Sequence, residues 1–209
     1  MGVSARQERR ERLAEIQAAQ QRAERRRNRI VLAVAVGVAL VLVVPTAIVV
    51  INAERRSAAA ESAAAAPIPG AREFTDLSAV HTQEKVAYTP EPPVGGDHHP
   101  TWQNCGFYDE PVAQEHAVHS LEHGAVWVTY DPDLPAGDVA TLRSLAGEHS
   151  YLLVSPYDGL AAPVVASAWG VQVELDGVDD ERLEPFLLRY LQGPQTPEPG
   201  AACSGGIGA

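Results

Sequence analysis

An uncharged apolar run of 22 residues near the start of the chain constrains its fold more than any other feature. The run, IVLAVAVGVALVLVVPTAIVVI, extends from Ile30 to Ile51 and contains no charged side chain. As a helix with a rise of about 1.5 Å per residue it would span roughly 33 Å, slightly more than the hydrocarbon core of a bilayer, about 30 Å. The sequence therefore predicts a single transmembrane helix, kinked where Pro45 removes one backbone hydrogen bond.

The charges before this run predict its orientation. Residues 1–29 carry nine arginines and four glutamates, a net charge of +5, which holds that end in the cytoplasm. A cleaved signal peptide is the alternative, but its apolar region is normally only about 7–15 residues long and its basic region short. We therefore expect an uncleaved signal anchor over residues 30–51, with a basic helix or tail before it that contacts anionic membrane lipids.

The part of the chain beyond the run is strongly acidic. Residues 52–209 contain 7 basic and 23 acidic side chains, a net charge of −16. A nucleic-acid-binding surface needs clustered lysines and arginines to contact phosphates, so this composition excludes nucleic acid as a partner. We expect this part to lie outside the cytoplasm, where an envelope protein is a conceivable partner.

Composition also divides the outer part into three. An Ala- and Pro-rich linker covers residues 52–71, a folded domain covers 72–193, and an irregular Pro- and Gly-rich tail covers 194–209. The only cysteines are Cys105 and Cys203, and in an oxidising compartment an even pair predicts a disulfide that ties the tail back to the domain. Two thiolate metal ligands are the alternative. A loop closed across 98 positions would stabilise the fold by about 4–5 kcal/mol in the chain-entropy model.

Periodicity within the domain predicts a compact α+β fold with a small β-sheet and two to three helices. The region before residue 111 is rich in Pro and Gly and predicts irregular loops, with a short extended segment at residues 85–88. No glycine-rich nucleotide-binding motif is present. The expected elements that follow are a strand at 125–130, a helix within 136–150, a strand within 151–157, a strand at 163–175 that breaks at Gly170, and a helix within 178–193.

The segment EHAVHSLEHGAVW, residues 115–127, concentrates three histidines and two glutamates before it turns apolar. A helix that begins near Pro111 and ends before Gly124 would place His116, His119 and His123 on one stripe, and an extended chain would leave His119 and His123 on one side. Both alternatives remain open at this stage. Both place His119 and His123 together, so His116 is treated as incidental.

Neutral imidazoles with a nearby carboxylate are typical metal ligands. The preferred interpretation is a divalent transition-metal site formed by His98, His119 and His123 with Glu122, because the paired glycines of GGDHH allow the chain to bring His98 to the end of the helix. An N/O ligand set without thiolate suits Zn²⁺, Cu²⁺ or Ni²⁺.

Two alternatives compete with metal binding alone. The letters HSLEH match H-x-x-E-H, which in one class of zinc proteases supplies two zinc ligands and a general base, here Glu122. A helix that ends at Gly124 weakens the match, and the sequence offers no other catalytic candidate, so we do not expect an enzyme. The second alternative is an envelope interaction or structural module in which the histidines only brace the loops.

The quoted segments also resemble a known family. PPVGGDHHPTWQNCGFYDEPV, AVHSLEHGAVWVTYDPDL and the later SAWG are similar to a membrane-anchored bacterial family, frequent in actinobacteria, named domain of unknown function 3105. The resemblance covers roughly residues 72–191. It implies a location in the plasma membrane of a bacterium and carries over His98, His119, Glu122 and His123, with His81 as a further histidine that matches. It implies no activity.

Overall fold

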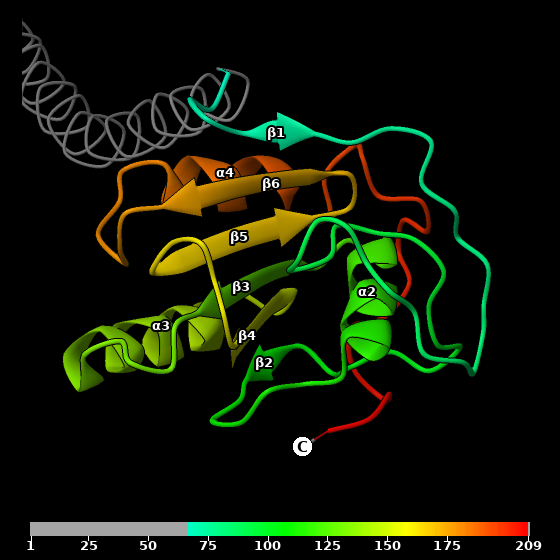
Figure 1. The fold of residues 1–209 in the computed structure, drawn as a ribbon, viewed down its shortest axis with the longest axis horizontal. Coiled ribbons are helices and arrows are strands. Elements are labelled where there is room, and N and C mark those ends of the chain that lie inside the picture. The colour runs from blue at the N-terminus through cyan, green and yellow to red at the C-terminus, as the bar shows by residue number, and fades with distance from the viewer. Residues whose placement is uncertain (1–66, 209) are drawn as a thin grey trace, which may run out of the picture. The chain divides into compact units, whose positions relative to one another are not determined.

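The computed structural model describes residues 67–208 (Figure 1). The expected membrane helix at residues 30–51, the basic segment before it and the linker up to residue 66 lie outside the described residues. Within 67–208, no helix is both long enough and apolar enough to cross a membrane.

The described residues form a mixed α+β fold, as the periodicity predicted. One six-stranded sheet has the order β1-β6-β5-β3-β4-β2, with β3–β4 and β4–β2 parallel and the other neighbours antiparallel. The strands are β1 (Arg72–Glu73), β2 (Gly106–Phe107), β3 (Val126–Tyr130), β4 (Leu152–Pro156), β5 (Val164–Ala168) and β6 (Val171–Leu175). The helices are α2 (Gln114–Glu122), α3 (Ala136–Glu148) and α4 (Leu183–Tyr190).

Helices α3 and α4 cover one face of the sheet, which we call the apolar face. Alternate residues of β3, Val126 and Val128, point to this side and are fully buried. They belong to one hydrophobic core together with Leu142 of α3 and with Phe186 and Leu187 of α4. The apolar residues of α4 recur every three or four positions, so a single stripe of the helix meets the sheet.

Helix α2 and the irregular loops cover the opposite face, which we call the polar face (Figure 1). Here Trp127 of β3 packs against α2, and its indole N–H donates to the hydroxyl of Ser155 at 3.0 Å. The side-chain amide of Gln172 donates to Ser167 and to the carbonyl of Pro92 in the loop layer. The buried amide of Gln172 is therefore paired across the boundary between sheet and loops.

Three details of the sequence prediction are corrected. The expected strand at 163–175 is the hairpin β5–β6, because Gly170 turns the chain with a φ of +70° and a Cβ there would lie 2.9 Å from the carbonyl oxygen of Phe74. The expected extended segment at residues 85–88 forms no strand, since the N–H of Val86 donates to the Glu115 side chain instead of a neighbouring strand. The edge strands β1 and β2 were missed, because two residues each carry no readable alternation.

Candidate metal centre

The end of helix α2 presents the histidines and the glutamate of the HSLEH segment. The helix ends at Glu122, and His123 caps it with helical dihedrals. Gly124 follows with a φ of +94°, which lets the chain leave the helix and enter β3 directly. His119 and Glu122, one turn apart, therefore share a side of the helix, and both are buried. Of the two alternatives that the sequence left open for this segment, the helix is the one present.

The glycine loop brings His98 to the same place. Gly95 and Gly96 have φ values of +147° and +116°, a conformation that side chains disfavour. His98 then pairs with the chain around His81, because its N–H donates to the carbonyl of Val80 and its own carbonyl accepts from Thr82. This short bridge sets the two imidazoles side by side, with ring centroids 5.0 Å apart.

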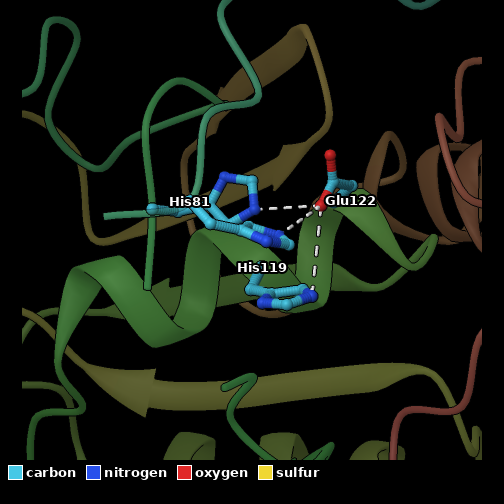
Figure 2. A group of neighbouring side chains, drawn as sticks. His81, His119 and Glu122 are labelled. Atoms are coloured by element: carbon cyan, nitrogen blue, oxygen red, sulfur yellow. Dashed lines mark hydrogen bonds and ion pairs between the residues drawn. The ribbon is translucent and has the colours of Figure 1, made fainter. Parts of the chain in front are cut away.

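Three imidazole nitrogens converge on one carboxylate oxygen (Figure 2). Oε2 of Glu122 lies 2.9 Å from Nε2 of His98, 3.7 Å from Nε2 of His81 and 4.0 Å from Nε2 of His119. The side chains of His98, His119 and Glu122 are buried, whereas that of His81 is 46% exposed. We call these four residues the inner group.

Backbone carbonyls orient the two buried rings. Nδ1 of His98 lies 2.7 Å from the carbonyl oxygen of Gly96, and Nδ1 of His119 lies 2.7 Å from that of His99. A carbonyl can only accept, so each Nδ1 carries a proton and donates it, which directs Nε2 toward Glu122. Burial lowers the pKa of His119 to about 4, reinforced by the neighbouring His123, His98 and His81, so His119 is neutral at physiological pH. Its Nε2 then offers a lone pair, as a metal ligand must.

The contact between His98 and Glu122 requires a positive charge between its two atoms. With Nδ1 of His98 donating to Gly96, Nε2 presents a lone pair in the neutral ring, and the ionised carboxylate presents only lone pairs. At 2.9 Å two such acceptors repel unless a proton or a metal ion lies between them. One proton would satisfy this pair alone, whereas a metal ion would also engage His81 and His119.

The spacing of the inner group fits a small tetrahedral ion. Around Zn²⁺, with bonds to nitrogen and oxygen of about 2.0–2.1 Å, neighbouring ligand atoms of a tetrahedron are about 3.3–3.4 Å apart. The three distances to the carboxylate oxygen, 2.9, 3.7 and 4.0 Å, bracket that value. All four ligand atoms lie within 4.8 Å of one another. Small movements of the side chains toward a common point would complete the coordination.

A second group shares His119 with the first. Ligand atoms of His119, His123 and Glu198 also lie within 4.8 Å of one another, and Nε2 of His123 is 3.6 Å from the Glu198 carboxylate. Nδ1 of His123 lies 2.7 Å from the carbonyl oxygen of Ala202, so its Nε2 is again the free nitrogen. We call His119, His123 and Glu198 the outer group.

The C-terminal tail supplies part of the outer group. The Cys105–Cys203 disulfide expected from the sequence is present. Close to it, the N–H of Glu198 donates to the carbonyl of Glu122 at the end of α2. These attachments bring the tail to His123, a placement that neither Pro-rich composition nor residue spacing signals.

The expected ligand set is thus divided between two groups. His98, His119 and Glu122 come together with His81, the histidine that the family resemblance added. His123 lies with Glu198, which the sequence analysis missed.

Other charged residues of the same segment have separate partners. The Glu115 carboxylate accepts from Lys85 and from the N–H of Val86. Burial acts to raise the pKa of Glu115, but these hydrogen bonds and the one to its own backbone N–H lower it below the usual value. His116 donates from Nδ1 to the carbonyl of Thr101 and belongs to neither group. Glu115 and His116 therefore hold the loops to α2.

Comparison with known proteins identifies a family without a described activity. No curated protein and no solved structure matches the chain. The family model described as "Protein of unknown function (DUF3105)" matches residues 79–205, more than half of the chain, including the glycine loop, α2 and the disulfide. The chain belongs to the domain of unknown function 3105 family.

Proposed function

We propose that this domain binds one divalent transition-metal ion through Nε2 of His81, His98 and His119 and the carboxylate of Glu122. The observation that carries the proposal is the 2.9 Å approach of two acceptor atoms, His98 Nε2 and Glu122 Oε2, with two further imidazole nitrogens directed at the same oxygen. Zn²⁺ fits best, because it favours four nitrogen and oxygen ligands in a tetrahedron, and Cu²⁺ is the main competitor.

The ligand set favours metal handling or structural stabilisation over hydrolysis. Four protein ligands close the coordination sphere of Zn²⁺, whereas catalytic zinc sites keep one position for water. In the H-x-x-E-H arrangement both histidines bind the ion and the glutamate acts as the base. Here Glu122 is in the position of a ligand, and His123 faces the tail.

We further propose that the domain works on the outer side of a bacterial plasma membrane. The apolar run at residues 30–51 and the arginines before it support an anchor with its N-terminus inside. The Cys105–Cys203 disulfide supports an oxidising compartment for the domain. Such a protein would bind metal ions in the cell envelope, either to hold them or to pass them on.

The direct test is equilibrium binding of Zn²⁺ to the full chain, purified in detergent and stripped of metal. The proposal expects one ion per chain. His81→Ala removes a half-exposed ligand without opening the core, and it should weaken affinity by at least about tenfold to hundredfold, the loss that follows even when a residue that only orients a ligand is removed. His149→Ala, at the end of α3, is the matched control and should leave affinity unchanged. Absence of stoichiometric binding in the wild-type chain, or equal affinity in both variants, would refute the site.

A further inference from the structure

The inner and outer groups both depend on a single nitrogen of His119. Nδ1 of this ring donates to the carbonyl of His99, so only Nε2 can bind an ion. That nitrogen lies 4.0 Å from Oε2 of Glu122 in the inner group, and His119 also belongs to the outer group with His123 and Glu198. One lone pair forms one metal bond, so the two groups cannot each hold an ion through His119 at the same time.

The two groups differ in their contact with solvent. The inner carboxylate, Glu122, is 5% exposed, whereas the outer carboxylate, Glu198, is 52% exposed. A hydrated cation can therefore meet Glu198 at the surface, where the negative charge raises its local concentration. The rings of His119 and His123 meet edge to face, with centroids 4.5 Å apart, so the two groups adjoin one another.

The outer group offers fewer ligands than the inner one. His123 Nε2, His119 Nε2 and the Glu198 carboxylate make three, and a cation there would keep water in its remaining positions. The inner group supplies four ligands, and three of its side chains are buried, so an ion there would keep less water. An ion that keeps its bond to His119 can exchange His123 and Glu198 for His98, His81 and Glu122, and it never becomes fully dissociated.

We propose that His119, His123 and Glu198 form an outer position through which a hydrated divalent cation enters and leaves the inner position by ligand exchange on His119. This inference rests on the proposed function and adds a route and a direction to it. The tail attachments at Glu198 and Cys203 keep the outer position in place. His81 is the exposed member of the inner group, so direct entry past His81 is the rival route that the experiment must exclude.

Exchange kinetics of Zn²⁺ test the route. The full chain loaded with Zn²⁺ is mixed with an excess of a chromogenic chelator, and the rate of ion transfer is followed; the reverse experiment measures uptake by the metal-free chain. Glu198→Gln preserves the size of an exposed side chain and removes its charge. We expect both transfer rates to fall about tenfold, while affinity at equilibrium stays within about threefold of the wild type.

Glu148→Gln is the matched control, because it removes the same charge from an exposed residue at the end of α3. It should leave both rates unchanged. Rates in Glu198→Gln equal to those of the wild type would overturn the proposal and assign entry to His81. Equal slowing in Glu148→Gln would also overturn it, since the effect would then reflect overall charge.

Stoichiometry and an isolated outer position give a second test. Saturating Cu²⁺, which binds nitrogen and oxygen ligands most tightly among divalent first-row ions, should load the wild-type chain with one ion. His98→Ala combined with Glu122→Gln should retain weaker Cu²⁺ binding that Glu198→Gln then removes. Two ions bound through these groups in the wild type, or residual binding that does not depend on Glu198, would contradict the shared ligand. These results are distinct from a failure of the proposed function itself, in which the wild-type chain would bind no ion.

Discussion

The two faces of the sheet are built on different principles. On the apolar face, α3 and α4 bury aliphatic and aromatic side chains against the strands, with Leu142 and Phe186 fully buried. On the polar face, the same strands contribute Thr129, Ser155 and Gln172, and the layer above them holds the histidine groups. A domain of this size needs one strong hydrophobic core, and the apolar face supplies it.

The difference indicates where function lies. Buried polar groups destabilise a fold unless each finds a partner, and most groups on the polar face find one in a backbone carbonyl or a hydroxyl. The inner group stands apart, because its carboxylate and imidazole nitrogens are acceptors that need a proton or a metal ion between them. Stability therefore depends mainly on one face, and the residues that could hold a metal ion are concentrated on the other.

Phe186→Ala should give the largest contrast between the two faces, a large loss of stability with unchanged metal binding. This substitution removes a fully buried ring from the apolar face, and we expect the free energy of unfolding to fall by about 3–5 kcal/mol. Chemical denaturation measures the loss. Zn²⁺ stoichiometry at temperatures where the variant is folded should be unchanged, and a simultaneous loss of binding would show that the two faces are not independent.

Low pH should destabilise the metal-free domain through His119, which lies on the polar face. Unfolded His119 takes up a proton near pH 6.5 and the folded residue only near pH 4, so protons favour the unfolded chain between these values. The metal-free domain should keep its full stability above about pH 6.5 and lose about 2 kcal/mol of it by pH 5 through this residue. Denaturation of the wild type and of His119→Gln at both pH values isolates the contribution. An identical pH dependence in the two proteins would contradict it.

Gly124→Ala should strain the junction between α2 and β3. Gly124 has a φ of +94°, and a Cβ there would lie 2.9 Å from Oγ1 of Thr196. We expect a loss of about 1–2 kcal/mol of unfolding free energy, together with weaker Zn²⁺ binding because the end of α2 must shift. Gly147→Ala in α3, where a Cβ meets open space, is the control. It should be neutral or slightly stabilising, and equal losses in both variants would argue against the strain at Gly124.

The smallest change in stability should come from Glu122→Gln. The amide of the new side chain can donate to Nε2 of His98, so the metal-free domain should remain within about 1 kcal/mol of the wild type. Stabilisation by added Zn²⁺ should nevertheless disappear. Thermal unfolding with and without the ion measures both effects. A loss of about 3–5 kcal/mol without metal would instead identify Glu122 as half of a structural ion pair.

Much of the fold follows from local patterns in the sequence. Alternation of apolar residues in AVWVTY and the spacing of leucines in the later helices predicted β3, α3 and α4 within a few residues. The disulfide followed from an even pair of cysteines in a part of the chain that the sequence predicts to lie outside the cytoplasm. The two-residue strands β1 and β2 could not be predicted from the sequence. They exist only because they pair with distant strands, and such pairing leaves no local pattern.

The candidate site was predictable within α2 and at His98, which the paired glycines were expected to bring to the end of the helix. Around a helix, position 119 lies between positions 122 and 123, about 60° from the first and about 40° from the second, so His119 meets Glu122 on one side and His123 on the other. His81 reaches His98 through a bridge between irregular segments, and Glu198 is held by a backbone bond to Glu122. Both contacts depend on tertiary structure, so spacing along the chain could not reveal them.

The central claim is best tested by locating a bound ion directly. A crystal structure of the Zn²⁺-loaded protein, measured on both sides of the zinc absorption edge, gives the ion position from anomalous scattering. The account predicts one ion about 2.0–2.2 Å from Nε2 of His81, His98 and His119 and from an oxygen of Glu122. A map without an ion there, with Nε2 of His98 still in direct contact with the Glu122 carboxylate, would contradict it.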